Sequence, residues 1–201
     1  MLVTLADTKT FLGINNNTQD SVLTMLINQA SAYIEKKCGR TFGETTYTNE
    51  EYDGTGKNEL KLNQFPVILF SQLQRNRATD NSDDWVTIDA EKYWIDLIIG
   101  IITKTSSFLE FDNRDDDGLT ESTTFNLGKN KYRVTYTAGF AEIPYDIQYA
   151  CMLFVSEINN KRKSGGIKSE TLGDHSVTFE SIFKSSPEIQ DIINNYREIN
   201  I

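Results

Sequence analysis

The sequence predicts an α+β protein: a small helical bundle with an inserted antiparallel β unit and a C-terminal helix. Near both ends of the chain, apolar residues recur at intervals of three and four, which is typical of helices. Between residues 46 and 137 they occur in short alternating runs separated by polar loops, which is typical of strands. With 201 residues, 38% apolar and 24% charged, the chain has the size and composition of a folded globular protein.

Two helices are expected before residue 46. Thr4 is followed three residues later by an aspartate, which indicates a capped helix start, and Gly13 is expected to end this short helix. After a run of three asparagines, Thr18 is expected to cap a longer helix. That helix should end at Gly39, because the preceding Lys36-Lys37 suits a helix C-terminus and glycine adopts the left-handed conformation readily.

A hairpin and five or six further short strands are expected in the middle of the chain. Residues 47–52 and 60–62 flank Asp53-Gly54-Thr55-Gly56, which predicts a hairpin with its glycines at positive φ. The other expected strands are residues 66–70, 85–88, 93–97, 101–111 with a polar break, and 132–137. The sequence therefore predicts a β unit here.

Helices return after residue 138. Pro144 is expected at the first position of a helix whose apolar stripe runs to Ile158, and Ser186-Pro187-Glu188 should start the last helix. Between them, residues 175–180 alternate like an exposed strand. We expect one domain of residues 1–201, in which residues 1–45 and 138–201 form the helical part and residues 46–137 the β insertion.

Charge and composition exclude several classes of protein. With 20 basic and 29 acidic residues the net charge is −9, which argues against a protein that wraps duplex DNA. Residues 46–135 carry sixteen of the acidic and ten of the basic residues, so the β insertion holds most of the excess. The longest apolar run, residues 97–102, is too short to cross a membrane, and no membrane association is expected.

Cys38 and Cys151 fall in predicted helices and are expected to be free, buried thiols. The first seven residues lack the basic region of a signal peptide. The chain is therefore expected to be made and kept in a reducing cytoplasm.

No motif completes a catalytic, metal or cofactor site. The single histidine, His175, has only sequence-local serine and aspartate neighbours. Asn113-Arg114-Asp115-Asp116-Asp117-Gly118 begins like a calcium loop, but its twelfth position is Thr124, so a solvated loop tip is expected and a weak cation site is the alternative. Gly54-Thr55-Gly56-Lys57 lacks the first glycine and the Ser/Thr of a phosphate loop. The sequence predicts no enzyme and no cofactor.

The basic run Lys161-Arg162-Lys163, with Lys168 nearby, is the one positive cluster of the sequence. It is expected to complement the C-terminal end of a helix. Contact with an acidic protein partner or with passing nucleic acid is the alternative.

Five segments, in order along nearly the whole chain, resemble the head-tail connector (adaptor) proteins of tailed bacteriophages. They are VTLADTKTFLGI, ASAYIEKKCGRTF, YDGTGKNELKLNQFPV, YRVTYTAGFAEIPYDIQYACMLFV and KSETLGDHSVTF. The chain departs from this family by a long acidic region between Phe70 and Tyr132, so an elaborated β part is expected.

The resemblance implies a virion structural protein without enzyme activity. Such a protein assembles as a dodecameric ring beneath the portal protein, extends the DNA channel and gives the stopper or tail a docking platform. DNA would pass through without specific binding, and the chain would be found in the virion neck after assembly in the host bacterial cytoplasm. A tail-completion or stopper protein is the alternative from the same particle. A metal-dependent hydrolase that uses the acidic loop at residues 112–117 is the alternative from another class.

The partner-binding element is expected between Lys168 and Phe179. This stretch follows Gly165-Gly166, which permits a hinge, and an exposed strand can add to a neighbour's sheet. The expected interface residues are Lys168, Ser169, Glu170, Leu172, Gly173, Asp174, Val177 and Phe179. An ordinary edge strand of the chain's own β unit is the alternative.

Overall fold

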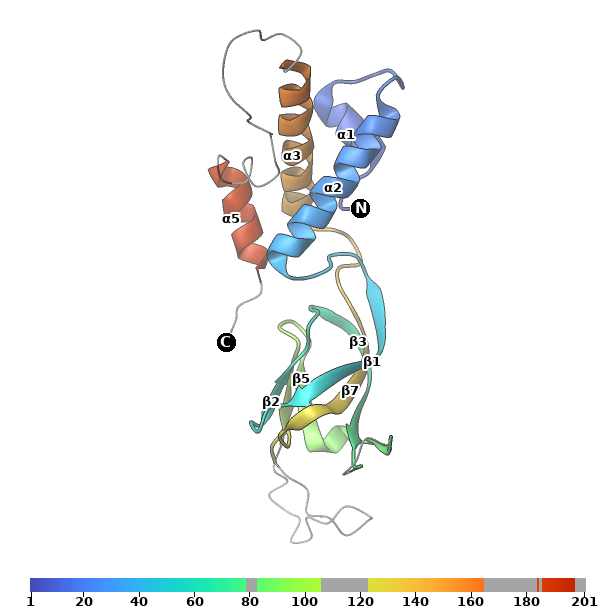
Figure 1. Cartoon of the computed structure of the whole chain (residues 1–201), viewed down its shortest axis with the longest axis vertical. Helices are drawn as coiled ribbons and strands as arrows, with labels where there is room; N and C mark the ends of the chain where they lie inside the picture. Colours follow the sequence, from blue (N-terminus) through green and yellow to red (C-terminus); the bar gives the residue numbers. More distant parts are fainter. Residues whose placement is uncertain (79–82, 106–122, 165–183, 185, 198–201) are drawn as a thin grey trace. The chain divides into compact units, whose positions relative to one another are not determined.

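The computed structural model describes residues 1–78, 83–105, 123–164, 184 and 186–197. The chain forms two compact units. The helical unit comprises Met1–Gly43 and Ala141–Ile201, and the β unit comprises Glu44–Phe140 (Figure 1). That the whole chain acts as one domain stays a prediction.

The described helices of the helical unit are α1 (Leu5–Leu12), α2 (Asp20–Cys38), α3 (Tyr145–Ser164) and α5 (Pro187–Tyr196). The predicted limits of α1 are confirmed. Thr4 Oγ1 accepts a hydrogen bond from the Asp7 backbone N–H at 3.1 Å, and Gly13 ends the helix at a φ of 66°. Gly39 ends α2 in the same left-handed conformation, at a φ of 72°.

The predicted cap of α2 is wrong. The N-cap residue is Gln19, which makes no side-chain cap hydrogen bond. The Thr18 hydroxyl instead donates to Asn16 Oδ1 at 2.6 Å, and the Thr18 backbone N–H donates to the same oxygen at 3.2 Å. An asparagine that closes a local turn in this way competes with the helix for the hydroxyl. The helix therefore starts at Asp20, past the predicted position.

The core of the helical unit lies where α2, α3 and α5 pack together (Figure 1). Their buried apolar residues are Leu23, Leu26, Ile27, Ala30 and Ile34 of α2, Ile147, Ala150, Phe154 and Val155 of α3, and Ile189 and Ile193 of α5. The predicted stripe of the third helix is confirmed, although Pro144 stands just before α3 rather than inside it. Cys38 and Cys151 are free and buried, as predicted.

Polar and aromatic contacts hold α5 in place. The Tyr196 hydroxyl donates to the Asp146 carboxylate, at 2.8 Å to Oδ1 and 2.9 Å to Oδ2. Arg40 is only 7% exposed. Its guanidinium lies 5.2 Å from the centre of the Phe42 ring and 5.6 Å from the centre of the Tyr196 ring. Stacking on aromatic rings lets a guanidinium be buried while it stays charged. These contacts join α5 to the C-terminal end of α2 and to the first turn of α3.

The β unit consists of two antiparallel sheets. The larger has the order β1-β7-β3-β4, with β1 (Thr45–Gly54), β7 (Gly128–Ala138), β3 (Val67–Asn76) and β4 (Trp85–Thr87). The smaller has the order β2-β6-β5, with β2 (Glu59–Lys61), β6 (Ile101–Lys104) and β5 (Tyr93–Asp96), and the 3₁₀ turn η1 (Ala90–Lys92) precedes β5. The predicted α+β class, with an antiparallel β unit and a C-terminal helix, is confirmed.

The predicted hairpin of residues 47–52 and 60–62 is wrong, because β1 pairs with β7 and β2 pairs with β6. Gly56 has a positive φ of 72°, but Gly54 is required for another reason. The backbone of Asn126 passes so close that a Cβ on Gly54 would lie 1.6 Å from the Asn126 carbonyl oxygen. Next to this crossing, Gly56 N–H donates to Phe125 O and Phe125 N–H donates to Lys57 O, each at 2.7 Å.

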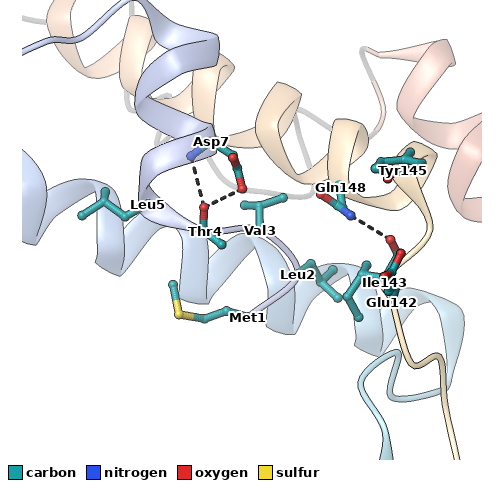
Figure 2. A pocket seen from close by; sticks show the side chains of 10 residues that line it. All are labelled: Met1, Leu2, Val3, Thr4, Leu5, Asp7, Glu142, Ile143, Tyr145 and Gln148. Atoms are coloured by element: carbon teal, nitrogen blue, oxygen red, sulfur yellow. Dashed lines mark hydrogen bonds between the residues drawn. The ribbon is translucent and has the colours of Figure 1, made fainter.

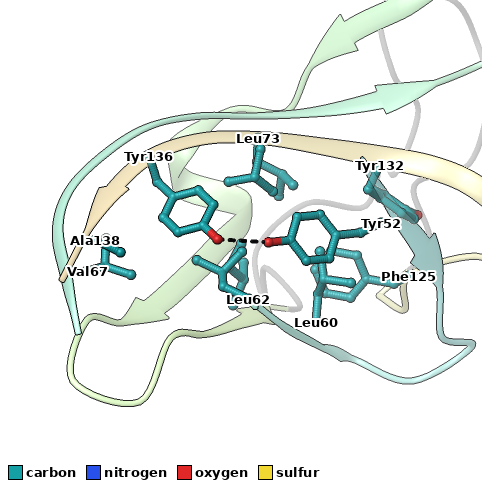
Figure 3. Packing of buried hydrophobic residues seen from close by; sticks show 11 residues of the cluster. Tyr52, Leu60, Leu62, Val67, Leu73, Phe125, Tyr132, Tyr136 and Ala138 are labelled. Carbon is teal, nitrogen blue, oxygen red and sulfur yellow. Dashed lines mark hydrogen bonds between the residues drawn. The ribbon is translucent and has the colours of Figure 1, made fainter. Parts of the chain in front are cut away.

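Both sheets contribute to one core (Figure 3). Tyr132, Val134 and Tyr136 of β7 are fully buried, and Phe125 meets the Tyr132 ring edge to face at 4.9 Å between centres. Ile102 brings the smaller sheet into the same cluster. Burial of one such side chain contributes about 1.5–3 kcal/mol, so this cluster is the main source of stability for the β unit.

We expect Gly54→Ala to destabilise the β unit, because the added methyl group meets a backbone atom that cannot move independently. Overpacking of this kind lowers the free energy of unfolding by about 1–3 kcal/mol or more. Both tryptophans, Trp85 and Trp94, lie in the β unit, so urea unfolding followed by tryptophan fluorescence reports on it. Gly43→Ala is the control, since nothing lies within 4 Å of a Cβ there. Equal stability of the two variants would contradict the close approach.

Candidate interaction surfaces

The predicted partner segment, Lys168 to Phe179, lies outside the described residues. So do His175 and the acidic loop Asn113 to Gly118. The roles assigned to these residues from the sequence stay predictions.

The basic run at the end of α3 has an internal role at Arg162. Arg162 Nη2 donates to Gln19 Oε1 at 3.0 Å and to Asn159 Oδ1 at 3.2 Å. Asn159 is buried, and Gln19 directly precedes α2. Arg162 therefore ties the last turns of α3 to the start of α2.

Across the described parts of the chain, no three His, Cys, Asp or Glu side chains gather into a group that could hold a metal ion. None of the described helices is long and apolar enough to cross a membrane.

A pocket of about 570 Å³ opens in the helical unit between the N-terminal segment and the start of α3 (Figure 2). Its lining is mainly apolar: Met1, Leu2, Val3, Leu5, Ile143 and Tyr145. Tyr145 is 82% exposed, so it stands at the surface rather than in the core. We call this hollow the N-terminal pocket.

Two polar groups of the N-terminal pocket donate to their own neighbours, and Glu142 also lines it. The Thr4 hydroxyl donates to Asp7 Oδ2 at 2.5 Å, and Gln148 Nε2 donates to Ile143 O at 2.7 Å (Figure 2). The Thr4–Asp7 pair also caps the start of α1, since Thr4 Oγ1 accepts the Asp7 backbone N–H. The surface of the pocket is suited to an apolar side chain rather than to a polar substrate.

A second apolar surface lies in the β unit, at the turn between β5 and β6. Leu97, Ile98 and Ile99 are 43%, 77% and 46% exposed. Ile68 and Leu69, at the start of β3, are exposed too, and the neighbouring Val67 N–H donates to Leu97 O at 2.6 Å. We call residues Leu97, Ile98 and Ile99 the apolar turn.

Hydrogen bonds fix the conformation of the apolar turn. Asp96 Oδ1 accepts the backbone N–H groups of Ile98 at 2.9 Å and of Ile99 at 3.2 Å. Gly100 closes the turn at a φ of 67°, and its carbonyl accepts the Leu62 N–H at 2.8 Å. Since an aspartate that bonds two residues ahead stabilises a turn, the three apolar side chains are held in a defined conformation.

A partly buried hydrogen-bond network stabilises the β unit. The Tyr136 hydroxyl donates to Glu50 Oε2 at 2.6 Å, the Tyr52 hydroxyl donates to the same oxygen, and the two hydroxyls lie 3.1 Å apart (Figure 3). Asn63 Nδ2 donates to Glu50 Oε1 at 3.1 Å. Burial, and then the hydrogen bond to Glu50, raises the pKa of both tyrosines above the ordinary value.

The two thiols are chemically quiet. Burial raises the pKa of Cys38 and of Cys151 to about 11. Because the thiolate is the reactive form, both thiols are unreactive at neutral pH.

The described residues thus present two apolar surfaces, one in the helical unit and one in the β unit. Residues 2–93 match the family described as Phage gp6-like head-tail connector protein, and residues 99–199 match the family described as Head completion protein. The chain belongs to the head completion protein family, whose model matches half of it, and its first half matches the phage head-tail connector family. The resemblance found in the sequence is confirmed.

Three solved structures from gene transfer agent (GTA) particles share the fold. The neck of an empty particle computed with C6 symmetry has a TM-score of 0.55 at 13% identity and covers 100% of this chain and 91% of that chain. The virion of a native particle has a TM-score of 0.54 at 14% identity and covers 100% of this chain and 91% of that chain. The neck of a native particle computed with C12 symmetry has a TM-score of 0.50 at 15% identity and covers 98% of this chain and 89% of that chain. No curated protein matches the sequence.

Family membership decides three predictions. A head-tail connector is a structural component of the particle, so the prediction that the chain is not an enzyme is confirmed, and the alternative of a metal-dependent hydrolase is wrong. The predicted location in the virion neck is confirmed by the same match.

Sequence reasoning missed both apolar surfaces. The N-terminal pocket joins residues more than 130 positions apart, and no local pattern indicates that. The apolar turn had a signal, because residues 97–102 form the longest apolar run. The run is too short for a membrane span, but three consecutive exposed apolar residues are themselves a sign of function.

Stability of the β unit is expected to fall above pH 10. In the folded protein the pKa of Tyr52 and Tyr136 is raised, whereas an unfolded tyrosine titrates near pH ~10, so the unfolded chain loses these protons first. Tyr136→Phe should be less stable at neutral pH by about 0.5–1.5 kcal/mol, because one hydrogen bond is lost. The difference should shrink as the pH rises from about 9 to 11, since the variant has one such tyrosine fewer.

Urea unfolding at a series of pH values, followed by tryptophan fluorescence, measures this difference. Tyr145→Phe is the control, because Tyr145 is 82% exposed and lies in the helical unit. A constant gap between wild type and Tyr136→Phe across this pH range would show that Tyr136 does not titrate differently in the two states.

Proposed function

We propose that this protein is the adaptor of a phage-like neck: it forms a ring under the portal, extends the DNA channel and provides the docking platform for the stopper or tail. The observation that carries the proposal is the pair of family matches, head-tail connector over residues 2–93 and head completion over residues 99–199. Together they span nearly the whole chain.

The ring has support from the fold and from the surface. Two neck structures that share this fold were computed with C6 and C12 symmetry. A ring of identical subunits needs two different, complementary patches on each subunit. The N-terminal pocket and the apolar turn are two such patches, on different units of the chain.

Passage of DNA without specific binding is consistent with the charge. The net charge is −9, and Arg162 of the basic run is engaged within the helical unit. A surface that offers few Lys or Arg side chains to phosphates releases few counterions and so binds DNA weakly.

A tail-completion or stopper protein is the second candidate. The head-tail connector match over the first half of the chain supports the adaptor. The order of binding separates the two: an adaptor binds the portal directly, whereas a stopper binds only after the adaptor is present.

We expect the purified chain to add a ring to the portal of the same particle, visible by electron microscopy of the mixture. Binding should need no other neck protein. A chain that stays monomeric at high concentration and with the portal would contradict the adaptor function. A chain that binds only to portals already carrying another ring would be the stopper.

The partner-binding segment proposed for this adaptor is Lys168 to Phe179, which follows α3 in the chain. Val177 and Phe179 would share one face of a strand that adds to the sheet of a neighbour or of the portal. The polar members of the segment would then lie at its rim: Lys168, Ser169, Glu170 and Asp174.

We expect Val177→Pro to keep most of the thermal stability of the subunit and to lose portal or neighbour binding. Proline removes one ladder N–H and restricts the backbone of the strand. Val177→Ile is the control, because it keeps the N–H and the β-branched shape. Thermal melting and the portal-binding assay are measured on both variants. Unfolding of Val177→Pro would mean that the strand belongs to the subunit's own β unit.

A further inference from the structure

We propose that the apolar turn of one copy inserts into the N-terminal pocket of the next copy, and that this contact anchors the ring. The inference rests on the proposed adaptor function and names the surface that function needs. It assigns the same chain two complementary roles, a projecting turn on the β unit and a receiving pocket on the helical unit.

The apolar turn has the properties of a protein anchor. Its three consecutive side chains are aliphatic, uncharged and exposed, and Ile98 at its centre is 77% exposed. Surface runs of this kind are unfavourable in a free protein unless they have a function. Because Asp96 and Gly100 already fix the turn, little conformational entropy is lost when it binds.

Asp96 is engaged within the turn. Its Oδ1 atom is engaged with two backbone N–H groups of the turn itself. The surface that projects beyond Asp96 is therefore apolar. This matters because two copies of net charge −9 repel each other, and an uncharged patch is where they can approach.

The N-terminal pocket matches the turn in chemistry and in size. Most of its lining is apolar, and Glu142 lines it too. The Thr4 hydroxyl and the Gln148 side-chain amide already donate to internal acceptors, so an apolar occupant leaves these two groups satisfied. Since a cavity of about 150 Å³ holds benzene, the twelve side-chain carbons of the apolar turn need roughly 300 Å³. A pocket of about 570 Å³ holds them and leaves room for the backbone of the turn.

One turn and one pocket per chain produce a head-to-tail contact. Such a contact joins two different surfaces, repeats from copy to copy, and closes into a ring when the rotation divides the circle. A contact between two identical patches would stop at a dimer.

The first test compares two charge substitutions at equally exposed positions. Ile98→Asp places a charge on the turn, whereas Leu127→Asp places it on another apolar residue of the β unit that is also 77% exposed. We expect Ile98→Asp to require more than tenfold higher concentration for ring assembly, measured by native mass spectrometry with the portal absent and present. Leu127→Asp should assemble like the wild type. Thermal stability of both variants should be unchanged.

A cross-linking test identifies the receiving surface. Cys38 and Cys151 are buried with raised pKa values, so a cysteine placed at the surface reacts selectively. With a short bismaleimide, a mixture of Ile98→Cys and Tyr145→Cys chains should give covalent dimers. Each variant alone should give few, because in a head-to-tail contact position 98 does not meet position 98.

The outcomes separate this contact from the function on which it rests. If the wild type forms no ring with or without the portal, the adaptor function fails. If Ile98→Asp forms rings as readily as Leu127→Asp, or if the mixture does not cross-link within wild-type-like rings, only this contact is wrong. A chain carrying both Ile98→Cys and Tyr145→Cys that cross-links within itself would show that the turn occupies its own pocket, which also overturns the proposal.

Discussion

The pairing of β7 with both β1 and β3 is the constraint on which the β unit depends. β7 lies between these two strands in the larger sheet and carries Tyr132, Val134 and Tyr136 into the core. Its partners come from far earlier in the chain, since Thr45 pairs with Ala138. No local turn can bring them together, so the loop entropy must be offset by the core that β7 completes. The apolar turn depends on the same strand order. The Leu97 carbonyl accepts the backbone N–H of Val67, the first residue of β3, and β3 is held beside β7.

This constraint explains which parts of the fold could be predicted. The ends of α1 and the stripes of α2 and α3 follow from residues within a few positions of each other, and the sequence analysis identified them. Strand positions were also recognisable, but strand partners were not. Gly54 is the clearest case: its local pattern indicates a hairpin, whereas the residue that requires a glycine there is Asn126, 72 positions later. Thr18 is a more local case: its sequence position indicates a helix cap, but its hydroxyl is bound by Asn16.

The same distinction holds for the interaction surfaces. The apolar run at residues 97–102 is visible in the sequence, but its meaning depends on Asp96, which fixes the turn and leaves the side chains exposed. The N-terminal pocket has no sequence signal, because Leu5 and Tyr145 meet only after the helices pack. The family resemblance therefore gave the function, whereas the contacts that could carry it came from the structure.

Charge and apolar surface have separate tasks in the proposed adaptor. An acidic ring lets DNA pass because it offers phosphates few partners, but the same charge repels neighbouring copies. Salt screens charge over about 8–10 Å, so it weakens this repulsion and leaves a hydrophobic contact unharmed. An assembly held by ion pairs would respond to salt in the opposite way. A rigid apolar turn in an apolar pocket therefore allows an acidic protein to assemble without the basic residues that would also hold the DNA.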